Sequence, residues 1–80
     1  MDRRQQSVLD EIIGFWRDHQ YSPSIRDLAR LTGINSTSLI RFYLGKLRED
    51  GQVLFDDGIS RSIRPAGLSI TIKSQPRRRQ

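Results

Sequence analysis

The side chains that could act as nucleophiles or acid–base groups lack the partners that such chemistry requires. Three serines, Ser24, Ser36 and Ser38, have no histidine or lysine with an evident activating role, and the sequence has one histidine and no cysteine. Two of the three adjacent acidic pairs fall in expected helices, where neighbours diverge by about 100°, and the third falls in an expected turn. We therefore predict no enzymatic activity, no metal site and no cofactor.

The remaining chemistry belongs to basic side chains, which are unevenly distributed. The net charge is +5, but residues 1–58 carry eight Lys and Arg against nine Asp and Glu. Residues 59–80 carry six basic residues and no acidic one. A basic end of this kind fits nucleic acid, an acidic membrane surface or an acidic protein, and charge alone does not choose among them.

The length and the apolar pattern predict one small domain. The chain of 80 residues has no apolar run that could span a bilayer and no signal peptide, so we expect a cytoplasmic protein without a membrane partner. We expect the domain over residues 1–66. Residues 67–80 form an extension with one further strand at 68–73, followed by a basic, disordered tail.

Apolar residues recur at helical spacing in three segments. The first covers residues 4–19, and the second lies between Ser24, which forms a capping-box pattern with Asp27, and Gly33. The third covers residues 36–50. The apolar residues expected in the core are Val8, Leu9, Ile12, Ile13, Phe15, Trp16, Tyr21, Ile25, Leu28, Ala29, Ile34, Ile40, Tyr43, Leu44 and Leu47.

Two strands follow the third helix. Residues 52–55 and 59–64 flank an Asp-Asp-Gly turn, which is a hairpin signal, and Pro65 is expected to end the second strand because it lacks an N–H group. A glycine-containing turn joins the second and third helices, as in a helix-turn-helix. The sequence therefore predicts a mostly α winged helix-turn-helix with a β-hairpin wing.

The third helix of such a fold enters the major groove of DNA, where its outward side chains contact bases. We predict that Arg41 donates to guanine O6 and N7, that Leu39 and Phe42 contact thymine methyls, and that Ser38 also reads bases. Alternatively, Leu39 and Phe42 pack under a C-terminal strand or across a dimer. The expected phosphate ligands are Ser24, Arg26, Ser36, Thr37, Lys46, Arg61 and Arg64.

The sequence resembles the N-terminal DNA-binding domain of the LexA repressor family over residues 4–64. The most specific matches are Arg4-Gln5-Gln6 at the start and Gly58-Ile59-Ser60-Arg61-Ser62-Ile63-Arg64 at the end. The resemblance implies a bacterial or phage repressor whose third helix reads the major groove while the wing touches the DNA backbone. Full-length family members continue into a self-cleaving peptidase and dimerisation domain, for which the residues after 66 are too few, so no self-cleavage is expected. In enteric members the positions that match Arg41 and Phe42 are acidic, which implies a different operator here.

The expected partner is double-stranded DNA, with nucleoid association as a consequence. A homodimer would form through residues 68–73 or on a palindromic site. The tail arginines Arg77, Arg78 and Arg79 either contact DNA or are only solvated. Two alternatives remain from the residues alone: a winged-helix adaptor or antirepressor that binds a protein, and a DNA-bending, excisionase-like architectural factor.

Overall fold

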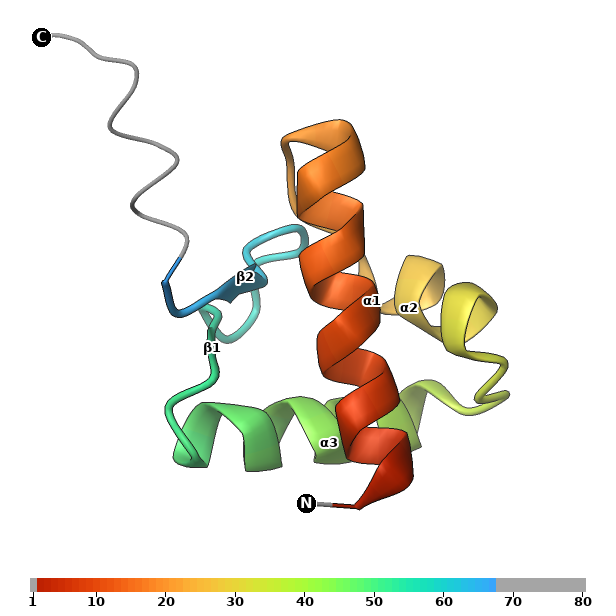
Figure 1. The fold of residues 1–80 in the computed structure, drawn as a ribbon. Coiled ribbons are helices and arrows are strands. Elements are labelled where there is room, and N and C mark those ends of the chain that lie inside the picture. The colour runs from red at the N-terminus through yellow and green to blue at the C-terminus, as the bar shows by residue number, and fades with distance from the viewer. Residues whose placement is uncertain (1, 68–80) are drawn as a thin grey trace, which may run out of the picture.

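The computed structural model describes residues 2–67, which form three helices and a small hairpin (Figure 1). The helices are α1 (Arg3–His19), α2 (Ile25–Thr32) and α3 (Thr37–Glu49), and the strands are β1 (Val53–Leu54) and β2 (Arg64–Pro65). This order confirms the predicted one. The strand expected at 68–73 and the basic tail lie outside the described residues.

The helix ends lie where the capping residues predicted them. Ser24 Oγ accepts from the backbone N of Asp27 at 3.0 Å, and Asp27 Oδ2 accepts from the backbone N of Ser24 at 3.0 Å, so the capping box is confirmed. Gly33 ends α2 with a φ of 78°, a left-handed conformation that favours glycine. Ser36 caps α3 by accepting from the backbone N of Leu39 at 3.1 Å.

A single apolar core lies between the three helices and the hairpin. Val8 and Ile12 of α1, Leu28 of α2, and the predicted seam of α3 are buried, and Val53 of β1 is buried beside them. Ile34, expected in the turn between α2 and α3, is also buried. The packing of α1 on both other helices fixes the orientation of α3, which is the element expected to carry the site.

Five residues expected in the core lie partly or largely at the surface. Ile13 is 42% exposed and Tyr21 is 51% exposed, while Trp16, Ile25 and Ala29 are half-buried against the core. Tyr21 instead packs edge-on against Phe15, with 5.4 Å between ring centroids, on the outside of the linker between α1 and α2. Helical spacing marks a wide apolar face, but the width that neighbours cover depends on tertiary packing.

The hairpin is shorter than predicted. The turn is confirmed, because Ile59 N donates to Asp56 O at 3.1 Å and Gly58 has a φ of 79°. The second strand was predicted over 59–64, ending before Pro65, but β2 covers only Arg64–Pro65, with Val53 opposite Pro65. Proline is tolerated there because an edge strand need not donate on its outer side.

Candidate nucleic-acid interface

α3 presents one face to the core and the opposite face outward. The inner face consists of four buried residues, Ile40, Tyr43, Leu44 and Leu47. α3 packs against α1. The outer face exposes Ser38, Arg41, Phe42 and Lys46. Within residues 2–67, no ion pair engages Arg41 or Lys46. The helix therefore brings the predicted base-reading residues Ser38, Arg41 and Phe42 to one surface, with an arginine available for a ligand.

The two apolar residues predicted to read bases differ in exposure. Phe42 is 57% exposed, and its ring centroid lies 5.5 Å from that of Tyr43. Leu39, by contrast, is half-buried and packs against the core. Only part of its side chain faces outward, because Leu39 flanks the buried seam of α3. Phe42 is the larger apolar surface left for a partner.

The predicted phosphate ligands at the helix N-termini lie at the surface. Arg26, Ser36 and Thr37 are exposed, and Ser24 is half-buried. Helix N-termini leave backbone N–H groups outside the helical hydrogen-bond pattern and carry a partial positive charge. Both serines already accept the capping hydrogen bonds described above, so their hydroxyl hydrogens are the groups left to meet a phosphate oxygen.

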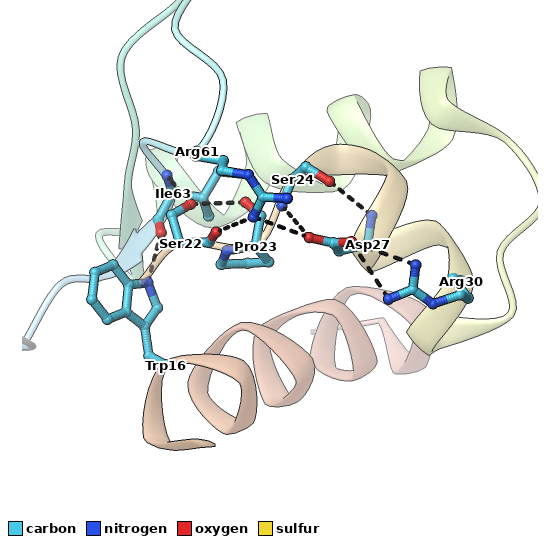
Figure 2. Close-up of polar contacts among 8 residues, drawn as sticks. All are labelled: Trp16, Ser22, Pro23, Ser24, Asp27, Arg30, Arg61 and Ile63. Atoms are coloured by element: carbon cyan, nitrogen blue, oxygen red, sulfur yellow. Dashed lines mark hydrogen bonds and ion pairs between the residues drawn. The ribbon is translucent and has the colours of Figure 1, made fainter. Parts of the chain in front are cut away.

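The two wing arginines make internal contacts, of which Figure 2 shows those of Arg61. Arg61 Nη1 donates to the backbone O of Ser22 at 2.9 Å and lies 3.3 Å from Asp27 Oδ2. Arg64 Nη1 donates to the backbone O of Ser62 at 2.7 Å, which is a contact within the wing. The Arg61 guanidinium therefore faces the start of α2, whereas Arg64 stays within the wing.

Arg48 of α3 holds the other side of the wing. Its Nη1 donates to the backbone O of Phe55 at 3.3 Å and to Asp57 Oδ1 at 3.1 Å. Its guanidinium carbon lies 3.9 Å from the centroid of the Phe55 ring, a cation–π distance. An open cavity of about 600 Å³ lies between these elements, and Arg26, Arg41, Gly45 and Arg48 are among the residues that line it.

Asp27 is the acidic group most affected by this arrangement. The hydrogen bond from the Ser24 backbone amide lowers the pKa of the Asp27 carboxyl below its usual value, and the Ser24 hydroxyl adds to this. Partial burial opposes the shift, while the charges of Arg61 and Arg30 lower the pKa further. Asp27 therefore stays ionised near neutral pH, between two arginines.

Sequence reasoning missed these tertiary pairs. Nothing in the spacing of Asp27 and Arg61, or of Arg48 and Asp57, indicates a contact, because each pair joins different elements. The same holds for Gln5, a buried polar residue whose Nε2 donates to the Asp50 carboxylate at 3.1 Å. The only available signal was the capping box, which placed Asp27 at the start of a helix.

Three helices with a capped glycine turn, followed by a two-stranded hairpin, define a winged helix-turn-helix protein. In the part of the chain that the structure describes, no helix is long and apolar enough to cross a membrane. The same part holds no cluster of three or more His, Cys, Asp or Glu side chains placed to bind a metal ion.

Comparison with known proteins gives the family. The family model of the LexA DNA binding domain matches residues 1–62, and this chain belongs to that family, as the sequence predicted. It is 38% identical over 63 residues to the LexA repressor of Herpetosiphon aurantiacus, covering 79% of this chain and 29% of the relative. It is 43% identical over 56 residues to the LexA repressor of Moorella thermoacetica, covering 70% and 27%. The transcription regulator LexA of Synechocystis is 31% identical over 75 residues, covering 88% and 37%. The chain thus spans 27–37% of the length of these three relatives.

Proposed function

We propose that this chain binds double-stranded DNA in a sequence-specific manner and acts as a transcriptional repressor. The observation that carries the proposal is the exposed Arg41 on the outer face of α3, without an ion pair in the described residues, in a domain of the LexA DNA-binding family. A guanidinium in this position matches the two acceptors of guanine in the major groove. Nucleoid association follows from the same proposal.

The outer face of α3 supplies the proposed base contacts. Arg41 pairs with guanine, Phe42 covers a thymine methyl, and Ser38 donates to a neighbouring base edge, while the exposed part of Leu39 adds a second apolar contact. The proposed phosphate ligands are Ser24, Arg26, Ser36, Thr37, Lys46 and Arg64. Arg61 is not among them, because its guanidinium is already engaged by Ser22 and Asp27.

Two copies on a palindromic site are also part of the proposal. One module of this size buries about 600–1,000 Å² of its surface on DNA, which is small for tight and specific binding. A second copy would double the contacts, through residues 68–73 or through the DNA alone. Light scattering of the protein with and without its DNA site tests this, and monomers under both conditions would contradict it.

The test of base reading is selection from a random duplex library with the natural chain and Arg41→Ala. We expect a short motif, and we expect the variant to lose preference at one or two positions, at about 1–3 kcal/mol of discrimination. Arg17→Ala is the matched control. This variant also removes one arginine charge, but Arg17 lies near the C-terminal end of α1. The contact of α1 with Asp50 is made by Gln5, near the opposite end of the helix, so Arg17→Ala should retain the motif.

The other outcomes separate the alternative functions. Binding to random duplex that weakens steeply with salt, but yields no motif, would indicate a DNA-bending or architectural factor. Absence of DNA binding at any salt concentration would contradict the proposal and direct the search to a protein partner. The family assignment favours DNA over that adaptor function.

A further inference from the structure

Two wing residues, Arg61 and Ile63, are attached to α1, α2 and the linker between them (Figure 2). The Arg61 guanidinium reaches the Ser22 backbone O and the Asp27 carboxylate, as described above. The backbone N of Ile63 donates to Ser22 Oγ at 2.9 Å, and the backbone O of Ile63 accepts from Trp16 Nε1 at 2.8 Å. Both polar groups of the Ile63 backbone are thus bound to the helical part of the domain and not to β1.

The partners in the helical part are themselves held in place. Ser22 is buried, and its hydroxyl donates to the backbone O of Pro23 at 2.8 Å, so its oxygen is oriented toward Ile63. The Asp27 side chain is 15% exposed and is fixed by the capping box of α2. Arg61 therefore contacts groups that other hydrogen bonds already hold in place. A half-exposed wing residue whose only role is to meet solvent or phosphate would not need such contacts.

The backbone of Arg61 supports the same conclusion. Its φ is 59°, in the left-handed region that a non-glycine residue seldom adopts without compensating contacts. The Ser62 side chain ties the next residue to the loop, because its Oγ accepts from Asp56 N at 2.9 Å and donates to Ile59 O at 2.9 Å. The hydrogen bonds within the turn at residues 59–62 and the contacts of Arg61 and Ile63 thus form one continuous connection between the wing tip and the start of α2.

We propose that Arg61 is a positioning residue, which together with Asp27 and Ser22 fixes the angle of the wing relative to α3. Its contribution to DNA binding is made through wing orientation and not through its own charge on a phosphate. This inference rests on the proposed DNA-binding function. It has an unusual consequence: removing the acidic charge of Asp27, which should strengthen binding to a polyanion, weakens it instead.

The test uses Arg61→Gln, Asp27→Asn and the double variant, with Arg64→Gln as the matched wing control. The amide oxygen of Asn can still accept from the Ser24 backbone, so Asp27→Asn keeps the capping hydrogen bond. We expect each of the first two variants to bind DNA about threefold to tenfold more weakly, as when a loop must be ordered on binding. The double variant should be no weaker than Arg61→Gln, because both act on one contact.

The salt dependence of DNA affinity separates positioning from phosphate binding. Loss of one phosphate contact lowers the slope of log K against log salt by about 0.9. We expect this loss for Arg64→Gln and an unchanged slope for Arg61→Gln. A reduced slope for Arg61→Gln, together with equal or tighter binding by Asp27→Asn, would overturn the proposal and make Arg61 a phosphate ligand. If Arg61→Gln does not fold, equal or tighter binding by Asp27→Asn alone overturns it.

A measurement without DNA keeps the two proposals distinguishable. Trp16 is the only tryptophan in the sequence, so its indole N–H gives a single NMR signal. We expect this proton to exchange with solvent several-fold faster in Arg61→Gln and Asp27→Asn, and at the natural rate in Arg64→Gln. Unchanged exchange in the first two variants overturns the positioning role. Absence of DNA binding by the natural chain, with faster exchange in these variants, would contradict only the proposed function.

Discussion

Gly45 lies in the interior of α3, where helix propensity disfavours glycine and the structure gives no internal reason for it. A Cβ built at this position meets no atom within 4 Å, and its φ is not positive. Alanine there removes the entropic cost of glycine, which is about 0.5–1 kcal/mol in the middle of a helix. We therefore expect Gly45→Ala to raise the free energy of unfolding by that amount, which corresponds to about 4–8 °C in Tm per kcal/mol for a domain of this size.

The assay is urea unfolding followed by circular dichroism, with Gly14→Ala as the control. Gly14 is a second helix-interior glycine, in α1, and its added Cβ would meet only the Arg17 side chain, at an ordinary distance of 3.5 Å. Both variants should be more stable than the natural chain. If Gly14→Ala is more stable than the natural chain and Gly45→Ala is not, a Cβ at position 45 does not have the free space that the structure shows there. If neither is stabilised, the reasoning from propensity is refuted.

The same pair of variants tests what Gly45 does for function. Gly45 lines the open cavity beside Arg41 and Arg48, on the side of α3 proposed to meet DNA. Glycine permits a close approach of a ligand to the backbone. We expect Gly45→Ala to bind DNA more weakly although it is more stable, and Gly14→Ala to bind as the natural chain does. Equal DNA affinity of both variants would show that the backbone of α3 is not approached at this position.

Three further predictions concern stability. Leu47→Ala, at a fully buried residue of α3, should lose about 2–5 kcal/mol, and an unchanged Tm would contradict the core assignment. Gly33→Ala should lose about 1–2 kcal/mol in urea unfolding, opposite in sign to Gly45→Ala, because Gly33 has a φ of 78°. The lowered pKa of Asp27 means that its carboxylate stabilises the folded state above about pH 4, and that this contribution is lost as the pH falls through the folded-state pKa. Unfolding measured between about pH 2 and 6 should therefore depend less on pH in Asp27→Asn, and an identical pH profile would remove the role assigned to this carboxylate.

The helices and their ends were predictable because their determinants are local. Ser24 and Asp27 lie three residues apart, and Gly33 ends the same helix, so the capping box and the left-handed stop are readable within a few residues. The apolar seam of α3 follows from the helical period alone. The position of Arg41 on the outer face follows from that seam by subtraction.

The wing and the edges of the core were predicted less well because their structure depends on distant residues. Residues 59–63 have the composition of a strand, but the backbone of Ile63 pairs with Ser22 and Trp16 and not with β1. Tyr21 and Leu39 show the same limit, since each is apolar enough for the core and only packing decides how much of it is covered.

The order of elements, the caps and the outer face of α3 are encoded locally, because propensity, capping and periodicity act over one or two helical turns. Which charged side chains are available for a ligand depends instead on how the elements pack together. Arg41 and Arg61 look alike in the sequence, yet Arg41 lies exposed without an ion pair in the described residues, and Arg61 lies against Asp27. A contact between residues 34 positions apart depends on how the chain folds back on itself, and no local pattern encodes it.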